Sequence, residues 1–153
     1  AFMSKDTAKI TSTDVLTKNS TTIGNYSDST FQLSQTGKYA TMSNWLLSST
    51  WNPSTTATTN FVDSSRNKIA QSSDGDGILV TTGADSSFSV QNIYDIAGNV
   101  MEWTLEWTSD DSYPCAKRGG NYGYSGSYHT AALRLKVSTT IADHGLGFRL
   151  SLW

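Results

Sequence analysis

The sequence predicts an α+β fold of short antiparallel strands, one or two helices and long irregular loops. Ser and Thr together make up more than a quarter of the chain, a composition typical of short strands and polar loops. Five Trp, seven Tyr and five Phe supply large side chains for a core and argue against disorder. Near the C-terminus apolar residues recur at every second position, which indicates half-buried strands.

Length and charge limit the possible classes of protein. The 153 residues suit one domain, residues 1–153, that buries its core without disulfides. A net charge of -2 with 16% charged residues predicts no nucleic-acid interface and no attraction to anionic membranes. The single cysteine, Cys115, excludes an internal disulfide and a cysteine-cluster zinc site. No apolar run approaches the ~20 residues of a membrane span, so we expect no membrane insertion.

The N-terminal half gives few signals of regular structure. In residues 1–40 the apolar positions are scattered, so we expect short strands and turns there. Residues 39–47 are the best helix candidate, because their apolar positions recur at helical spacing and would form one stripe. This helix would end before Pro53, because the residue that precedes a proline is pushed out of helical geometry.

The rest of the chain predicts strands. Residues 74–77 form a turn, and a short buried strand follows it at residues 78–80. Further strands are expected at residues 101–107, 131–137 and 146–152. The last two are expected to be antiparallel and half-buried, because their apolar residues alternate with period two.

One segment, residues 92–107, mixes small, acidic and indole residues in a way that no periodic element requires. Within it, two carboxylates alternate with exposed backbone carbonyls in a glycine-containing turn, an arrangement of oxygen atoms that suits a calcium ion. The candidate calcium ligands are Asp95, Gly98, Val100 and Glu102. The alternative is structural: Asp95 caps the turn and Glu102 pairs with an arginine.

Catalytic motifs are not evident. Cys115 precedes Lys117 and Arg118, which would lower the pKa of the thiol if they were adjacent in space. A catalytic cysteine needs a base, and nothing in the spacing ties His129 or His144 to this thiol. No Gly-x-Ser-x-Gly string supports a hydrolase triad. These residues therefore predict neither a hydrolase nor a thiol enzyme.

Three strings, with Arg134 between the second and the third, together resemble a known family: residues 94–104, 118–122 and 147–149. The most specific of them is Asp-x-Ala-Gly-Asn-Val-x-Glu-Trp. They resemble the C-terminal core of the formylglycine-generating-enzyme/sulfatase-modifying-factor domain, a variant of the C-type lectin fold. The resemblance covers residues 90–153 and implies a single C-type lectin-like domain. It also implies calcium as a cofactor, because the four candidate ligands match the family's pattern residue by residue.

The catalytic part of this family does not carry over. The family's enzymes place two cysteines shortly after the glycine pair, where they bind copper and activate oxygen. Here Tyr124 and His129 stand at those positions, and Cys115 lies before Gly119. The resemblance therefore implies neither copper nor formylglycine generation. The alternative is an enzyme of this family or a relative with other chemistry, such as sulfoxide synthesis or C–S bond formation, which the missing cysteine pair disfavours.

A second group with this fold fits better: the variable proteins of diversity-generating retroelements, which occur in phages, bacteria and some archaeal viruses. In these proteins framework residues keep the fold, while diversified residues near the C-terminus form a ligand-binding face. The resemblance implies a non-catalytic protein, placed on a virion or cell surface, that binds a protein or glycan on a host or other cell surface. The candidate face residues, which lie between framework-like strings, are Gly123, Tyr124, Tyr128, His129, Leu133, Leu135, Lys136, Val137, Ile141, Asp143, His144 and Gly145.

The tyrosines of this region suit a binding face. Tyr122, Tyr124 and Tyr128 would supply large, rigid, amphipathic contact area at a small cost in entropy, as tyrosines do in antibody paratopes. The alternative is that they pack against Trp103, Trp107 and Trp153.

Residues Leu133, Leu135 and Val137 give conflicting indications. Their alternation predicts a core strand, whereas the retroelement hypothesis places them on a variable surface. If both hold, we expect an unusually apolar exposed patch. A purely structural component of a surface or a virion is a third possible function.

Overall fold

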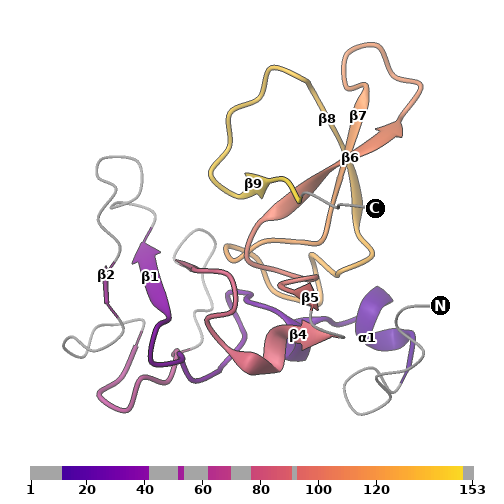
Figure 1. Cartoon of the computed structure of the whole chain (residues 1–153). Coiled ribbons are helices and arrows are strands. Elements are labelled where there is room, and N and C mark those ends of the chain that lie inside the picture. Colours follow the sequence, from indigo (N-terminus) through magenta and orange to yellow (C-terminus); the bar gives the residue numbers. More distant parts are fainter. Residues whose placement is uncertain (1–11, 42–51, 54–61, 70–76, 91–92, 150–153) are drawn as a thin grey trace.

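The computed structural model describes residues 12–41, 52–53, 62–69, 77–90 and 93–149. Within these ranges the chain forms short helices and strands joined by long loops (Figure 1). The helical elements are α1 (Asp14–Thr17) and two 3₁₀ helices, η2 (Thr21–Ile23) and η3 (Ser86–Phe88). In this part of the chain no helix has the length and apolar character that crossing a membrane requires.

Strands outnumber helices among the described residues. They are β1 (Lys38–Thr41), β2 (Asn52–Pro53), β3 (Ile78–Val80), β4 (Ser89–Val90), β5 (Ile93–Tyr94), β6 (Met101–Trp107), β7 (Cys115–Arg118), β8 (Arg134–Val137) and β9 (Leu146–Gly147). One sheet has the order β2-β1-β3, β4 pairs with β5, and a four-stranded sheet has the order β8-β7-β6-β9. Neighbouring strands are antiparallel except β6 and β9, which are parallel. In Figure 1 the four-stranded sheet lies above the smaller sheets and α1.

The helix predicted at residues 39–47 is wrong where the structure describes it. Tyr39 belongs to strand β1 and lies opposite Val80 of β3, and Ala40 lies opposite Leu79. Tyr39 and Ala40 are each 2% exposed. Pairing with β3 buries these side chains in a core that an isolated helix could not reach, so tertiary contacts override the helical spacing. The other residues of the predicted helix, 42–47, lie outside the described residues.

Two strand predictions are confirmed. Residues 78–80 form β3, and residues 101–107 form β6. Both are short apolar or aromatic-rich runs, which suits the pleated geometry of a sheet. The turn expected at residues 74–77 lies, apart from Gly77, outside the described residues.

The two C-terminal strands are shorter than predicted. The strand expected at residues 131–137 begins only at β8, because Leu133 N–H donates to the Thr130 carbonyl (3.0 Å) in a preceding turn. Of the strand expected at residues 146–152, the described part forms a strand only in β9. Its expected antiparallel pairing is wrong, because β9 lies parallel to β6. The loop that joins β8 to β9 swings out beside the sheet in Figure 1, and it carries the last of the candidate face residues.

Two apolar clusters form the core. The larger one joins the β1 and β3 region to η3 and consists of Phe31, Leu33, Tyr39, Val62, Ile78, Val80, Ala84 and Phe88. In the smaller one, Ile23, Tyr26 and Ala97 pack against the partly buried Val15, Leu16, Ile96 and Ala131. Within β6 only Met101 is fully buried, at 1% exposure. The core therefore lies mainly below the four-stranded sheet, whose strands are left partly accessible.

The Gly-Asn pair of the most specific string joins three segments. Asn99, at φ +58°, buries its side-chain amide against β3. Its Oδ1 accepts from Val80 N–H (3.0 Å) and its Nδ2 donates to the Val80 carbonyl (2.9 Å), so the amide substitutes for a neighbouring strand. Asn25 Nδ2 also donates to Asn99 Oδ1 (3.0 Å). A Cβ on Gly98 would lie 2.5 Å from the Asn25 carbonyl oxygen, so the close approach needs glycine.

Candidate functional site

The four-stranded sheet presents two chemically different faces. Lys117 of β7 lies opposite Trp103 of β6 and Leu135 of β8, so these three side chains share one face. Arg118 lies opposite Arg134 and projects with it from the other face. The candidate residues of β8 are therefore divided between the two faces.

The second face is charged. Glu106 Oε2 accepts from Arg118 Nη2 (2.9 Å), and Glu106 Oε1 accepts from Arg134 Nε (2.6 Å). These hydrogen bonds, that of Arg118 first, lower the pKa of Glu106. Lys136 Nζ donates to Asp110 Oδ2 (3.1 Å), and this bond lowers the pKa of Asp110. Lys136 thus lies on the charged side of the sheet, away from the other candidate residues of β8.

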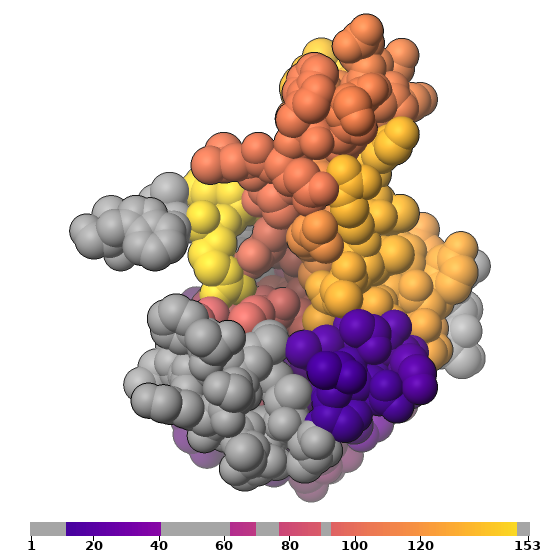
Figure 2. Space-filling model, turned by 90° about the vertical axis from the view of Figure 1, so that its right-hand side faces the viewer, coloured from indigo at the N-terminus to yellow at the C-terminus, as the bar shows by residue number. Residues whose placement is uncertain are grey.

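The first face is largely apolar. Leu133 and Leu135 are half-buried, and Val137 is buried at 3% exposure, as the alternation predicts for a core strand. The most exposed apolar side chains of the sheet lie instead on β6, where Leu105 is 107% and Trp107 64% exposed. The end of the β6–β7 hairpin stands out from the body at the top of Figure 2. The exposed apolar patch expected at Leu133, Leu135 and Val137 is therefore wrong, because these side chains are half-buried or buried.

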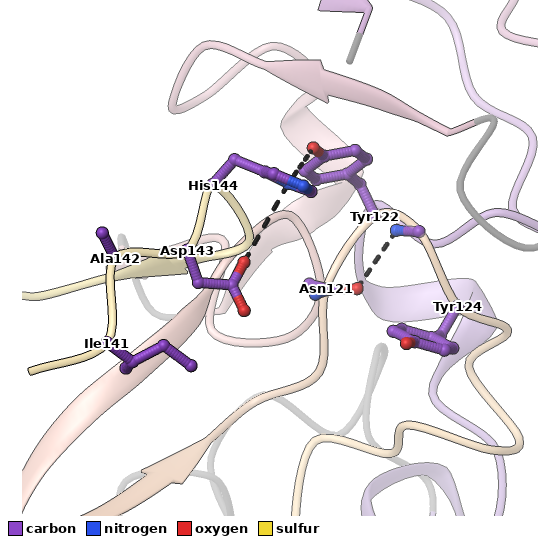
Figure 3. Close-up of a pocket in the computed structure, with 8 residues that line it drawn as sticks. Asn121, Tyr122, Tyr124, Ile141, Ala142, Asp143 and His144 are labelled. Carbon is purple, nitrogen blue, oxygen red and sulfur yellow. Dashed lines mark hydrogen bonds and ion pairs between the residues drawn. The ribbon is translucent and has the colours of Figure 1, made fainter. Parts of the chain in front are cut away.

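A pocket of about 380 Å³ lies between two loops, residues 121–124 and 141–144. Its lining consists of Asn121, Tyr122, Gly123, Tyr124, Ile141, Ala142, Asp143 and His144. Figure 3 shows Tyr124 on one side of this pocket, Ile141 and Asp143 on the other, and Asn121 between them. The loop after the glycine pair and the loop before β9 thus meet around one cavity.

Three aromatic rings form a cluster at the edge of the pocket. Tyr124 stacks on His129 with ring centroids 3.9 Å apart, and Tyr128 stacks on the same imidazole at 5.1 Å. Burial, and then the nearby charge of Lys117, lower the pKa of His129. Tyr128 remains 71% exposed and Tyr124 38% exposed. The two tyrosines therefore both contact the imidazole of His129 and each other, and both remain partly exposed.

Tyr122 was expected to supply exposed contact area on the binding face, but it has a structural role instead. It is 1% exposed, and its hydroxyl shares a hydrogen bond of 2.8 Å with His144 Nδ1. A Cβ on Gly77 would lie 2.1 Å from the Tyr122 carbonyl oxygen, so the chain is tightly packed on this side. Tyr122 thus forms a fixed inner wall that positions His144.

Local hydrogen bonds also hold the polar side chains of the pocket. Asn121 Oδ1 accepts from Gly123 N–H (3.1 Å), and Asp143 Oδ1 accepts from Gly145 N–H (2.7 Å). Asp143 Oδ2 lies 3.9 Å from Lys117 Nζ, a long ion pair. The pocket walls are therefore ordered by contacts within the protein before any ligand arrives.

The structure gathers some candidate face residues and separates others. Five line the pocket: Gly123, Tyr124, Ile141, Asp143 and His144. Tyr128 and His129 complete the ring cluster beside it. His129, Val137 and Gly145 are buried, and a Cβ on Gly145 would lie 2.3 Å from Asn121 Nδ2. Lys136 lies on the opposite face of the sheet.

Sequence reasoning missed two residues that line this pocket beside the candidates. Asn121 belongs to the framework-like string that contains the glycine pair, yet its side chain borders the cavity. Ala142 was passed over between Ile141 and Asp143. Only their positions in the sequence could have indicated that these two residues line the pocket, because both directly adjoin candidate residues or glycines of the loops.

A second cavity, of about 370 Å³, contains all four candidate calcium ligands together with Arg149. Arg149 Nε and Nη2 both donate to Glu102 Oε1, at 2.8 and 2.6 Å. Nη2 also donates to the Asp95 carbonyl (3.0 Å), and Nη1 donates to the Tyr94 carbonyl (2.8 Å). The pairing of Glu102 with an arginine, the structural alternative for this residue, is therefore present.

The fit of this cavity to a cation depends on Asp95. Its Oδ2 accepts from Gly83 N–H (3.2 Å), whereas Oδ1 is buried and has no hydrogen-bond partner among the described residues. Burial raises the pKa of this carboxyl group. The described residues hold no group of three or more His, Cys, Asp or Glu side chains suited to a metal. A calcium ion here would therefore depend on backbone carbonyls as well as on the two carboxylates.

Comparison with known proteins identifies a matching family and a similar solved structure. The sequence model of the family described as "Sulfatase-modifying factor enzyme 1-like domain" matches residues 23–152. No curated protein sequence matches the chain. Among solved structures, the chain is similar to Treponema denticola variable protein 1, with 33% identity and a TM-score of 0.32. That similarity covers 37% of this chain and 26% of the other, so the chain spans about a quarter of the length of that protein.

Proposed function

This chain belongs to the family of sulfatase-modifying factor enzyme 1-like domains, and we propose that it is a non-catalytic, ligand-binding member with a diversified C-terminal face. The observation that carries the proposal is the pocket between residues 121–124 and 141–144, because five candidate face residues come together there. Pockets lined by aromatic side chains and a few fixed polar groups are the usual form of ligand sites.

The different roles of the framework residues and the face residues support this function. Asn99 and Arg149, which belong to the recognisable strings, hold the chain together through buried or multiple hydrogen bonds. Tyr128 and Ile141, which belong to the candidate face, are 71% and 42% exposed. Substitutions at exposed side chains change stability little, whereas loss of buried hydrogen bonds is destabilising. Such a framework tolerates variation at the face.

The absence of a second cysteine supports a non-catalytic role. The chain contains only Cys115, so the cysteine pair that the family's oxidases use for copper cannot form within it. The alternative, an enzyme with different chemistry, would need reactive groups in the pocket. There, Tyr122 and His144 hydrogen-bond each other, and Asp143 caps a turn. We propose that the pocket binds its ligand, a protein or glycan displayed on a host or other cell, without transforming it.

Sequencing the same locus from sibling isolates tests this function. We expect substitutions to concentrate at the candidate face residues, with residues 94–107 unchanged. Val137 should vary only among apolar residues, because its side chain is 3% exposed. Substitutions spread evenly over the whole chain would overturn the proposal. A near-identical repeat beside a reverse-transcriptase gene in the flanking DNA would supply the mechanism of diversification.

We also propose that calcium binds at Asp95, Gly98, Val100 and Glu102, with the ion supporting the fold. The unpartnered, buried Asp95 Oδ1 supports this assignment, because a buried carboxylate oxygen without a partner is destabilising unless a proton or cation meets it. Arg149 already occupies Glu102 Oε1, so the ion would share this carboxylate with a guanidinium. We therefore expect weak binding, in the range of about 10⁻⁴–10⁻³ M that is found for extracellular calcium modules.

A further inference from the structure

We infer that the pocket between residues 121–124 and 141–144 takes the ring of an uncharged sugar. The inference rests on the proposed ligand-binding function and narrows it to one chemical class. It follows from three properties of the pocket: an aromatic wall fixed in advance, planar polar side chains opposite that wall, and a local charge that is already balanced.

The aromatic wall is Tyr124. Its ring stacks on His129 at 3.9 Å with an interplanar angle of 23°, so the imidazole holds it in place from behind. Because His129 is 8% exposed, the stack is anchored in the body of the protein. The C–H face of a saturated sugar ring packs against such a flat aromatic surface, and a wall that is already ordered loses little entropy on binding.

The polar groups lie across the pocket from this wall. Figure 3 shows Asp143 on the far side from Tyr124 and Asn121 between them. Asp143 uses Oδ1 to accept from Gly145 N–H, and within the described residues its Oδ2 meets only Lys117, at 3.9 Å. An oxygen that lacks a close donor can accept hydrogen bonds from hydroxyl groups of a ligand. Five of the eight lining residues carry polar side-chain groups: Asn121, Tyr122, Tyr124, Asp143 and His144.

The charge of the pocket favours a neutral ligand. Lys117 Nζ lies 3.9 Å from Asp143 Oδ2, so the ammonium group supplies the counter-charge of the carboxylate. The Lys117 side chain is only 15% exposed, which limits screening of this pair by solvent. A cationic ligand would be attracted by Asp143 but repelled by Lys117, and an anionic ligand the reverse, so a net charge gains little here to offset its loss of hydration. A polyhydroxyl ring without charge meets neither penalty.

The size of the pocket favours a sugar over a folded protein partner. Its volume of about 380 Å³ lies near the lower end of the ~300–1,000 Å³ that small-molecule sites occupy. A stable protein interface instead buries about 800 Å² on each partner around an apolar centre. Among the large exposed apolar side chains of the described residues, Tyr124 and Ile141 line this pocket, whereas Leu105, Trp107 and Phe148 do not, so the apolar area at the pocket itself is small.

Nuclear magnetic resonance with defined glycosides tests the inference. The probes are the methyl glycosides of glucose, galactose, mannose, N-acetylglucosamine and fucose at millimolar concentration. For at least one of them we expect saturation transfer to its ring protons and shifts of the amide signals of residues 121–124 and 141–145. Tyr124→Ala and Asp143→Asn should each weaken that binding about tenfold or more, which corresponds to about 1.4 kcal/mol.

Matched variants control for nonspecific effects. Tyr113→Ala removes a tyrosine that is 53% exposed outside the pocket, and Asp111→Asn removes an exposed carboxylate. Neither should change glycoside binding, and circular dichroism confirms that each variant is folded. An equal loss of binding in these controls would overturn the inference.

Charged relatives of one sugar test the argument from charge. Glucosamine and methyl glucuronide should bind more weakly than the neutral glycosides. Replacing Lys117 with Met removes the counter-charge of Asp143, so this variant should gain affinity for glucosamine over the wild type. Stronger binding of either charged sugar to the wild-type protein would contradict the inference.

Failure of the sugar inference can be told apart from failure of the proposed function. If no glycoside shifts the pocket signals while sibling sequences still vary at the face residues, the ligand class is wrong and a protein ligand takes its place. If sibling sequences vary evenly along the chain, the diversified face itself is wrong, whatever the pocket binds.

Discussion

Arg149 Nε and Nη2 both donate to one oxygen of Glu102, at 2.8 and 2.6 Å. The same guanidinium reaches the carbonyls of Tyr94 and Asp95, so a single side chain links the segment after β9 to β6, to the end of β5 and to the residue that follows β5. The loop of residues 138–145 closes just before this clamp. The clamp therefore fixes the far end of the pocket-forming loop without using any residue of the pocket.

Removing the clamp should destabilise the fold. Arg149→Met deletes four hydrogen bonds from a charged donor, and we expect the free energy of unfolding to fall by about 1–3 kcal/mol, because the site is only partly buried. Urea denaturation measures the change. Lys18→Met is the matched control, since its exposed pair with Asp14 should contribute less than about 0.5 kcal/mol. Equal losses of unfolding free energy in the two variants would show that the hydrogen bonds of Arg149 contribute no more than an exposed ion pair.

Lys68 should make the stability depend on pH. Its ammonium group is buried among Asn25 Oδ1, Ser29 Oγ and the Tyr26 carbonyl, and burial lowers its pKa from 10.5 to about 7, while the charge of Asp28 opposes this shift. Between these two values the unfolded chain binds more protons than the folded chain, so stability rises with pH. A single proton gives a slope of at most about 1.4 kcal/mol per pH unit.

Unfolding free energies measured in urea between pH 7 and 9.5 test this dependence. This range stays below the region where Tyr26, whose pKa burial raises, would add an opposite slope. At high pH Lys68→Met should be less stable than the wild type, because it leaves buried acceptors without a donor, and the stability of the variant should not change across the range. A wild-type protein that is equally stable at both ends would contradict the depressed pKa.

Calcium should raise the melting temperature if the Asp95 cavity binds it. At a concentration ten times the dissociation constant, a bound ion adds about 1.4 kcal/mol of stability by mass action. The comparison is between millimolar calcium and a chelator, in the wild type and in Glu102→Gln. Glu106→Gln serves as the control, because Glu106 lies on the charged face and outside this cavity. An unshifted wild-type midpoint would exclude calcium from this cavity, and an equal shift in Glu102→Gln would remove Glu102 as a ligand.

The sequence predicts those features of the structure that depend on residues close together in the chain. Strands β3 and β6 were predicted from local composition, and they are confirmed. The match of the family to residues 23–152 confirms the family and its α+β fold, which the short strings near the C-terminus had indicated. Val137 is buried, as the alternation along β8 predicts. These features depend on neighbouring residues or on a specific string.

Other features depend on partners that are remote in the sequence. The helix predicted from residue 39 onwards is wrong, because the spacing of apolar residues cannot reveal that Tyr39 pairs with Val80. Lys68 gave no signal, because its three acceptors belong to a segment 39 to 43 residues away. The pairing of Glu102 with an arginine was foreseen, but only the fold identifies that arginine as Arg149.

Saturation mutagenesis, with the folded fraction of each variant measured by resistance to proteolysis, tests the central claim most directly. At the exposed face positions Tyr124, Tyr128 and Ile141 we predict that most substitutions change stability by less than about 0.5 kcal/mol. At Gly98, Asn99 and Arg149 most substitutions should reduce stability by about 1–3 kcal/mol or more. If substitutions at the face positions unfold the protein as often as those at the framework positions, the separation of a fixed scaffold from a variable ligand-binding face is wrong.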